Sequence, residues 1–491
     1  MKHTVLYQLI VLGFLMLLAG CGGNRPPVMD ASADAPRIFP DYAGVTIPAG
    51  IAPMNFNVDD AEYVYVKVTG SKGGEMEAHG DYARFDAGDW HELTERNAGG
   101  DLKFDVYVMK RGGEWHRHAP FTMHVSDVPL DDYGVIYRKI APGYETFSKI
   151  GLYQRDLSSF EETPVIEETA VEGKCMNCHY SNRGSSRQFV FHIRGKNGGT
   201  VLRKGDSLRY LNTKTPETAG NATYGYWHPD GRYIVFSANR IVQNFYLNPE
   251  QNIEPWDVVS DLIILDTETD RIITSPLVAT PDCETTPAFS PDGKKIYFCK
   301  ADSVIMPAEY DKLRYSLCSI DFDAATGSFG SRIDTIIAAD AIGKSISLPR
   351  PSYDGRYLMY NVTDHGTSPI HHSDADLWLM DLASGETWPM TELNSDRSDA
   401  YHNWSGAGGW FLFNSKRLDG MYGNLYLSRV GSDGKATKPF LLPQENPLKY
   451  YSESLHSFNA PDFISDKISL PMPEVRDMVK EGRIVNVSVR K

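Results

Sequence analysis

Alternating apolar and polar positions dominate the chain from about residue 41 to residue 127. Residues 64–68, 102–108 and 121–125 each change between apolar and polar side chains at every step. A period of two predicts strands with one buried face. Pairs of glycines between these runs supply the turns (Gly73-Gly74, Gly99-Gly100, Gly112-Gly113). The pattern therefore predicts a β-sandwich-like domain over residues 41–127.

Residues 128–172 break the alternation. The segment contains Pro142-Gly143 and an acidic patch that includes Glu161-Glu162 and Glu167-Glu168. Proline and glycine together favour a turn. We interpret the segment as a connector, with a short helix expected near residues 144–150.

The remainder of the chain repeats one pattern: a buried aromatic residue, a polar turn ending in glycine, then an alternating strand. The copies begin at Tyr226, Ala288, Pro351 and Asn403. Asp-Gly between two apolar runs is the strongest short hairpin signal, and such hairpins must stack on neighbours to bury their faces. We expect one group of residues to be equivalent (Phe236, Phe298, Tyr360 and Phe413) and a second group to be buried between neighbouring repeats (Trp227 and Trp404).

These segments resemble the PD40 repeats of TolB-like, WD40-like β-propellers. Residues 376–382, followed by Ser384-Gly385-Glu386, are similar to the last strand and turn of such a blade, and residues 261–266 are a second copy. The resemblance covers about residues 200–470. It implies an all-β chain with a propeller over 198–470 and a C-terminal tail over 471–491. It implies little about function, because propellers serve as scaffolds for many tasks.

Two degenerate copies raise the expected number of blades to six. One begins at His456-Ser457-Phe458-Asn459. In the other, residues 187–191 align with residues 232–236, so that residues 173–197 form a first blade. This alignment puts Tyr180-Ser181 where Trp227-His228 stands in the next blade. It also predicts that the cysteines before Tyr180 lie on the same rim as the Asp-Gly turns.

The N-terminus carries an export signal. An apolar run from Val5 to Leu18 follows Lys2 and His3 and ends in Leu18-Ala19-Gly20-Cys21. A short apolar run that ends in small residues is typical of a signal peptide, here residues 1–20, and these four residues resemble a bacterial lipobox. That resemblance implies lipid on Cys21, which anchors the protein in the cell envelope, periplasmic side or outer membrane. The alternative is an ordinary signal peptide with a chance cysteine. Residues 21–40 have the composition of a tether.

Charge narrows the choice of partners. The chain has 491 residues and a formal net charge of −15. An acidic surface repels phosphate backbones, so nucleic acid is not an expected partner. TolB-like propellers commonly act in complexes, and the resemblance therefore implies a protein partner at the propeller surface.

The motif Cys175-Met176-Asn177-Cys178-His179 is the most specific chemical signal. Two thiols at this spacing can add to the two vinyl groups of a haem, and the adjacent histidine then binds the iron. We expect a covalent haem c on Cys175 and Cys178, with His179 as iron ligand. A redox-active disulfide, a structural disulfide and a zinc site remain alternatives, although thioredoxin-like chemistry needs a βαβ context and zinc needs further ligands.

A sixth iron ligand would favour electron transfer, and an open position would favour ligand sensing. Among nearby histidines, the blade alignment favours His228, and His192 is the next candidate. A bound porphyrin needs an apolar or aromatic gap beside His179. Two other histidine groups, His116-Arg117-His118 and the segment 371–376, could bind a metal, but solvated loops are the simpler interpretation of both.

Three further cysteines remain to be assigned: Cys283, Cys299 and Cys318. Cys299 and Cys318 stand at neighbouring ends of strand-like runs, where a disulfide is one interpretation and small buried apolar residues the other. No Gly-x-Ser-x-Gly elbow, Walker A motif or dinucleotide fingerprint is present.

Two hypotheses follow; the sequence leaves enzymatic activity open and favours a non-enzymatic redox or binding protein. In the first, the protein is a membrane-anchored c-type haem protein whose propeller presents or shields the haem for electron transfer or sensing. In the second, the propeller is a platform that binds a protein or an envelope polymer, and the Cys pair is structural or binds zinc. The arrangement also resembles uncharacterised envelope lipoproteins that combine CxxCH with PD40 repeats.

Overall fold

The computed structural model describes residues 25–141, 150–171, 173–195, 197–245, 253–406 and 408–490. The signal peptide, Cys21 and residues 144–149 of the expected short helix lie outside the described residues. No helix among the described residues is long and apolar enough to cross a membrane.

The N-terminal domain is built on one main sheet. Its order is β2 (Thr46–Ile47), β8 (Phe121–Val125), β6 (Gly100–Met109), β4 (Tyr63–Gly70) and β5 (Glu75–Gly80), with β7 (Trp115–Arg117) also paired to β6. The three alternating runs of the sequence are thus strands β4, β6 and β8. A separate short pair joins β1 (Ile38–Phe39) to β3 (Asn57–Val58).

A helix that the alternation did not predict packs onto this sheet. Helix α2 (Ala87–Arg96) begins at Asp86, whose side chain accepts from the amides of Gly88 and Asp89. Its Trp90 is fully buried and stacks on Phe85. The domain is therefore a sheet with a helix and a short strand pair, where the sequence predicts two facing sheets. Local capping starts the helix, and a period-two reading does not detect it.

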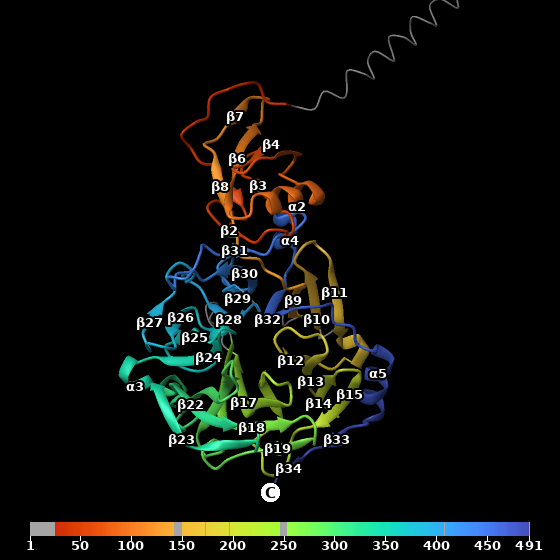
Figure 1. Cartoon of the computed structure of the whole chain (residues 1–491), viewed down its shortest axis with the longest axis vertical. Helices are drawn as coiled ribbons and strands as arrows, with labels where there is room; N and C mark the ends of the chain where they lie inside the picture. The colour runs from red at the N-terminus through yellow and green to blue at the C-terminus, as the bar shows by residue number, and fades with distance from the viewer. Residues whose placement is uncertain are drawn as a thin grey trace, which may run out of the picture.

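The rest of the chain forms a β-propeller. The sheets of the described residues divide into six four-stranded units, and Figure 1 shows them arranged around a centre with the N-terminal domain at one side. Along the chain the first five units are β12–β15, β16–β19, β20–β23, β24–β27 and β28–β31. Strands β12–β15 span Met176–Ser181, Gln188–Ile193, Gly199–Lys204 and Ser207–Asn212, and β16–β19 span Ala222–Trp227, Tyr233–Phe245, Ile253–Asp266 and Arg271–Ile273. Strands β20–β23 span Cys283–Phe289, Lys295–Ala301, Ser316–Asp323 and Ser328–Ile337, and β24–β27 span Ser345–Pro351, Tyr357–Thr363, Asp376–Asp381 and Thr387–Pro389. Strands β28–β31 span Asp399–Trp404, Trp410–Ser415, Asn424–Arg429 and Phe440–Leu441.

The sixth unit joins two distant parts of the chain. Strands β9 (Gly134–Ile140), β10 (Gly151–Asp156) and β11 (Glu162–Glu167) pair in order, and β32 (Ser457–Ile464) pairs with β9 as the innermost strand. Residues 128–172 are therefore not a connector, because they supply three strands of a blade. The degenerate copy at His456 is the strand that closes the ring, since it completes a blade begun some 300 residues earlier.

The C-terminal segment is also ordered. After α4 (Pro447–Glu453) and β32, the chain forms α5 (Met472–Glu481), β33 (Val485–Asn486) and β34 (Ser488–Val489). Strand β33 pairs with β15, and β34 pairs with β19. The expected tail thus extends the outer edges of two blades, which covers edge strands that would otherwise be exposed.

The repeat alignment is confirmed in detail. The fourth residue of the second strand in four units (β17, β21, β25 and β29) is a buried aromatic residue, at most 1% exposed: Phe236, Phe298, Tyr360 and Phe413. Trp227 and Trp404 are buried, and each indole N–H donates to a carbonyl of the preceding blade, at Tyr180 and Arg350 respectively. These contacts join neighbouring blades.

Candidate functional site

A ring of β-bulges marks the centre of the propeller. In the innermost strand of each unit, the register to the next strand shifts by one residue. The extra residue has φ between 44° and 52°, a backbone conformation that residues other than glycine seldom adopt. The set is Cys178, Tyr224, Thr286, Leu348, Tyr401 and Ala460. The second cysteine of the motif therefore occupies a position that recurs in every blade.

The bulges surround a cavity of about 510 Å³. Five of the six bulge residues line it, all except Thr286. Cys178 and His179 lie in its wall together with Tyr180, His192 and Arg194. The innermost strands of distant blades thus bring the motif to a central chamber that is large enough for a sizeable ligand.

The wall of this cavity is cationic. It contains Arg138, Arg194 and Arg350, and no Asp or Glu of the described residues lines it. The side-chain oxygen of Asn177, in the amide orientation that satisfies both groups, accepts from Arg194 Nη2 at 2.6 Å and Nε at 3.1 Å. The Arg350 guanidinium lies 5.4 Å from the ring centre of Tyr226. In a chain of net charge −15, this cluster of arginines favours an anionic group.

Cys175 lies just before β12, next to the same wall. Arg138 Nη2 donates to its Sγ at 3.0 Å. Both motif cysteines are partly exposed and neither forms a disulfide. The structure thus places two accessible thiols at the edge of the cavity, one on the bulge and one beside an arginine.

His179 is almost completely buried. Its side chain packs beside Phe189 and the backbone of Ile136, and the residue is 1% exposed. Burial, with a smaller contribution from the charge of Arg138, lowers the pKa of His179 to about 3, so the imidazole is neutral. Neither ring nitrogen makes a hydrogen bond of ordinary geometry, which is uncommon for a buried imidazole.

His192 is also in the cavity wall, and the structure brings it to the motif. It pairs across strands with Asn177, and its Nδ1 lies 3.2 Å from Thr200 Oγ1. Burial lowers the pKa of His192 to about 4, so this imidazole is neutral too.

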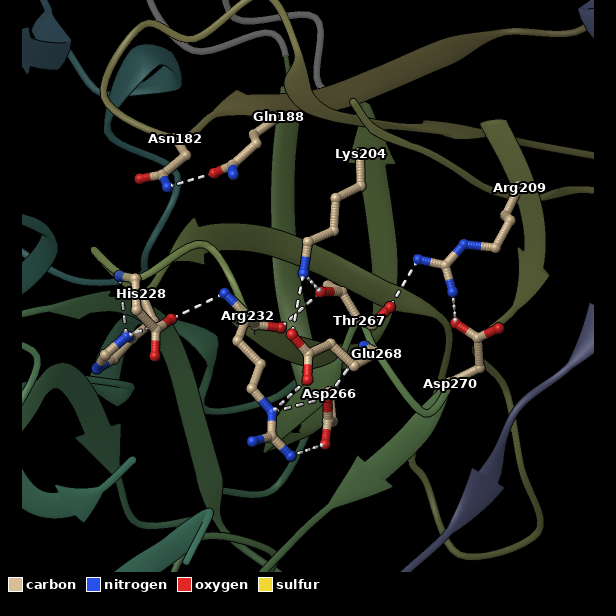
Figure 2. A network of polar contacts seen from close by, with 11 residues as sticks. Asn182, Gln188, Lys204, Arg209, His228, Arg232, Asp266, Thr267, Glu268 and Asp270 are labelled. Atoms are coloured by element: carbon tan, nitrogen blue, oxygen red, sulfur yellow. Dashed lines mark hydrogen bonds and ion pairs between the residues drawn. The ribbon is translucent and has the colours of Figure 1, made fainter. Parts of the chain in front are cut away.

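The structure does not bring His228 to this cavity. Its ring packs 4.9 Å from the ring of Phe289, and its Nε2 donates to the Gly293 carbonyl at 3.1 Å. Its Nδ1 lies 2.8 Å from Asp230, and Figure 2 shows that this network continues to Arg232 and Asp266. His228 therefore does not line the cavity of the motif, contrary to the expectation, because the residue belongs to the Asp-Gly turn and packs between two blades.

The motif and the Asp-Gly turns also lie toward different ends of the centre. Turn residues Pro229 and Pro291 line a second cavity of about 20 Å³, whereas Cys178 lines only the large one. Tyr180 lines both. The motif occupies the start of β12 and the turn follows its end, so the predicted shared rim is incorrect.

The aromatic gap expected beside His179 is not what the structure shows. Tyr180 lines the large cavity, but Tyr226 and Trp227 line only the small one. Arginine, asparagine and histidine side chains make up much of the large cavity's wall. The space adjoining the motif is therefore polar and cationic, with tyrosines as its main aromatic surface.

Tyr401 and His402 were not found from the sequence. They stand at the bulge and the next position of their strand, as Cys178 and His179 do in theirs. His402 Nε2 donates to the Met359 carbonyl at 3.0 Å, and burial lowers the pKa of His402 to about 3. An alignment of the innermost strands at the motif itself would have revealed the pair.

The other cysteines are free and buried. Cys318 pairs across strands with Phe298, whereas Cys299 pairs with Leu317. Cross-strand partners share a face and successive residues alternate, so Cys299 and Cys318 face opposite sides of their sheet. This excludes the disulfide and leaves the interpretation as small buried apolar residues.

Comparison with known proteins finds distant structural similarity and no sequence match. No family model matches the chain, and no curated protein matches it. Among solved structures, TolB from Acinetobacter baumannii aligns with a TM-score of 0.44 and 13% identity, over 78% of this chain and 86% of that one. An oligogalacturonate lyase in complex with manganese aligns with a TM-score of 0.38 and 13% identity over 69% and 81% of the two chains. A hypothetical selenium-binding protein from Sulfolobus tokodaii aligns with a TM-score of 0.40 and 9% identity over 84% and 96%.

Proposed function

We propose that this protein is a lipid-anchored propeller of the bacterial cell envelope that carries a haem c in its central cavity. Cys178 carries the proposal, because the second motif cysteine is the bulge residue in the wall of the 510 Å³ cavity. Cys175 supports it through its contact with Arg138 of the same wall. Export agrees with this chemistry, since the N-terminus up to Cys21 resembles a lipoprotein signal.

Two cysteines and a histidine are the donor set of a haem c. Two thiols without a disulfide would hold the vinyl carbons, and the neutral His179, whose ring nitrogens make no hydrogen bond of ordinary geometry, would hold the iron. A bound haem supplies one-electron transfer or binding of a small ligand at the iron. The sequence offered His228 and His192 as further iron ligands. Of these two histidines, His192 lines the cavity and His228 does not.

The arginines have a role in the same proposal. Haem carries two propionate carboxylates, and guanidinium groups bind carboxylates through paired charge-assisted hydrogen bonds. Arg138, Arg194 and Arg350 line the cavity with no described acidic side chain among them. Their charge would orient the carboxylates, and the tyrosines of the wall would contact the porphyrin edge.

The test is covalent haem in the chain. Protein made with a c-type maturation system should retain haem through acid-acetone extraction and a denaturing gel, and should show sharp reduced-state absorption bands. Cys175→Ser combined with Cys178→Ser should abolish both signals. The matched control is Cys283→Ser, at a buried cysteine away from the cavity, which should keep them. Wild-type protein that matures without covalent haem would overturn the proposal.

A second candidate function rests on the cationic wall alone. Here the propeller is a binding platform without haem, and its cavity receives an anionic group of a protein or an envelope polymer. Calorimetry of haem-free protein with small polycarboxylates should then show binding that Arg194→Gln weakens. The zinc version of the Cys pair has less support, because neither cysteine belongs to a cluster of three metal-ligating side chains among the described residues.

A further inference from the structure

Outside the motif, a buried carboxylate meets two histidines near the central cavity. Glu254 is the second residue of β18, while His365 and His372 stand in the segment between β25 and β26. One ligand atom from each lies within 4.8 Å of the others. The His371-His372 segment was interpreted from the sequence as a solvated loop, but His372 is only 3% exposed and Glu254 only 1%.

The possible ligand atoms of this cluster lie close together, and two of them lack a hydrogen bond. Glu254 Oε2 lies 3.2 Å from His372 Nε2, yet this nitrogen has no hydrogen bond of ordinary geometry, and neither has His365 Nε2. The two imidazole rings are 4.8 Å apart and inclined by 74°. Two buried imidazole nitrogens without a hydrogen bond are a costly arrangement unless something else binds them.

The backbone leaves room at the same point. Gly366 has φ of +71°, and a Cβ there would stand 3.3 Å from Glu254 Oε1 and 3.5 Å from His372 Nε2. Glycine therefore lets the chain turn closely around the donor groups. The Asp374 carboxylate lies 3.9 Å from Nδ1, the other ring nitrogen of His372, on the side where metal-binding histidines commonly have an acidic neighbour.

We infer that Glu254, His365 and His372 form a binding site for a divalent transition-metal ion of the zinc type. Two imidazoles and one carboxylate are a common donor set for Zn²⁺, and three protein ligands leave a fourth position for water or another group. The inference does not depend on haem, because none of the three residues lies in the motif or in the wall of the large cavity.

The metal would tie together two blades that are not neighbours. Glu254 belongs to the long hairpin β17–β18, whereas both histidines belong to the unit β24–β27; the unit β20–β23 lies between these two in the chain. Residues Ile241, Gln243 and Pro255 of the same hairpin line the large cavity. A bound ion would therefore fix the hairpin that forms this part of the cavity wall.

The experiment uses the full chain, produced without haem maturation, stripped of metal with a chelator and titrated with Zn²⁺. Competition with a chromophoric chelator should reveal a tight equivalent of Zn²⁺, which Glu254→Gln and His372→Ala each weaken by about 100-fold. Co²⁺ at the site should give visible d–d absorption that both variants lose. Binding should also slow amide exchange in residues 239–245 and 253–259.

Two control variants separate this site from the other candidates. The double change His116→Ala with His118→Ala removes the only other cluster of this kind among the described residues, which includes Asp34. The double change Cys175→Ser with Cys178→Ser removes the motif thiols. Both should keep the equivalent that depends on Glu254. If His372→Ala does not fold, the nearly isosteric Glu254→Gln decides. Wild-type protein without tight Zn²⁺, or Zn²⁺ lost only in a control variant, would overturn the inference.

Discussion

Removal of the Trp227 indole should loosen the motif strand from the next blade. Trp227 ends β16 and is 3% exposed, and its Nε1 donates at 3.1 Å to the carbonyl of Tyr180, the residue after the motif. Trp227→Ala deletes a buried indole, which costs about 3–5 kcal/mol of unfolding free energy. About 1 kcal/mol of this belongs to the hydrogen bond. Trp227→Phe keeps most of the ring and should cost about 1–2 kcal/mol.

The assay is urea unfolding of the full chain, in which the midpoint shifts while the slope is unchanged. Trp404→Ala is the matched positive case, because Trp404 donates in the same way to the Arg350 carbonyl at 3.0 Å. Trp115→Ala is the control, since Trp115 is partly exposed in β7 of the N-terminal sheet, and it should cost less than about 1 kcal/mol. A loss below about 1 kcal/mol for Trp227→Ala would refute the blade-joining role.

Three further predictions concern other parts of the molecule. His228→Ala should lower the unfolding free energy by about 1–3 kcal/mol, because its ring is buried against Phe289, yet leave the absorption spectrum of haem-loaded protein unchanged; a change of spin state would contradict the position found here. Burial raises the pKa of Asp462 from 3.8 to about 7, so the folded state holds a proton that the unfolded state has lost. The unfolding free energy should therefore fall as the pH rises from about 4 to about 7; Asp462→Asn should flatten this fall in urea titrations at several pH values, and an unaltered profile would exclude Asp462 as its source. Cys21→Ser should release the protein from the membrane fraction, and a variant that still sediments with membranes after a high-salt wash would show that lipid is not the anchor.

Local patterns were sufficient for the repeated elements. Asp-Gly turns, period-two strands and aromatic positions such as Phe236 and Phe413 depend on contacts within one hairpin and its neighbour, so four blades could be predicted from the sequence. The spacing of Cys175 and Cys178 likewise needs no tertiary information. Helix α2 was not predicted, because it depends on an N-cap at Asp86 and on the burial of Trp90 and not on a repeated pattern.

The closing blade could not be predicted in the same way. Its outer strands β9–β11 lie before the motif, and its inner strand β32 lies near the C-terminus. Neither part carries the repeat's turn and strand together. The part before the motif therefore resembles a connector, and the part near the C-terminus resembles an incomplete copy of the repeat. Only closure of the ring, which pairs β32 with β9, makes them one sheet.

The sequence by itself determined the repeated hairpins, the motif and the export signal, because each depends on residues close together in the chain. The tertiary structure decided what the motif faces. Every innermost strand carries a bulge, and the bulge residue Cys178, with φ of 51°, lines the central cavity. Arg138, Arg194 and Arg350 meet there from three blades, while His228, close to the motif in the repeat alignment, is held between blades at the turn. Which side chains share a site depends on how the blades close around the centre, and a local sequence pattern does not specify the distances between residues of different blades.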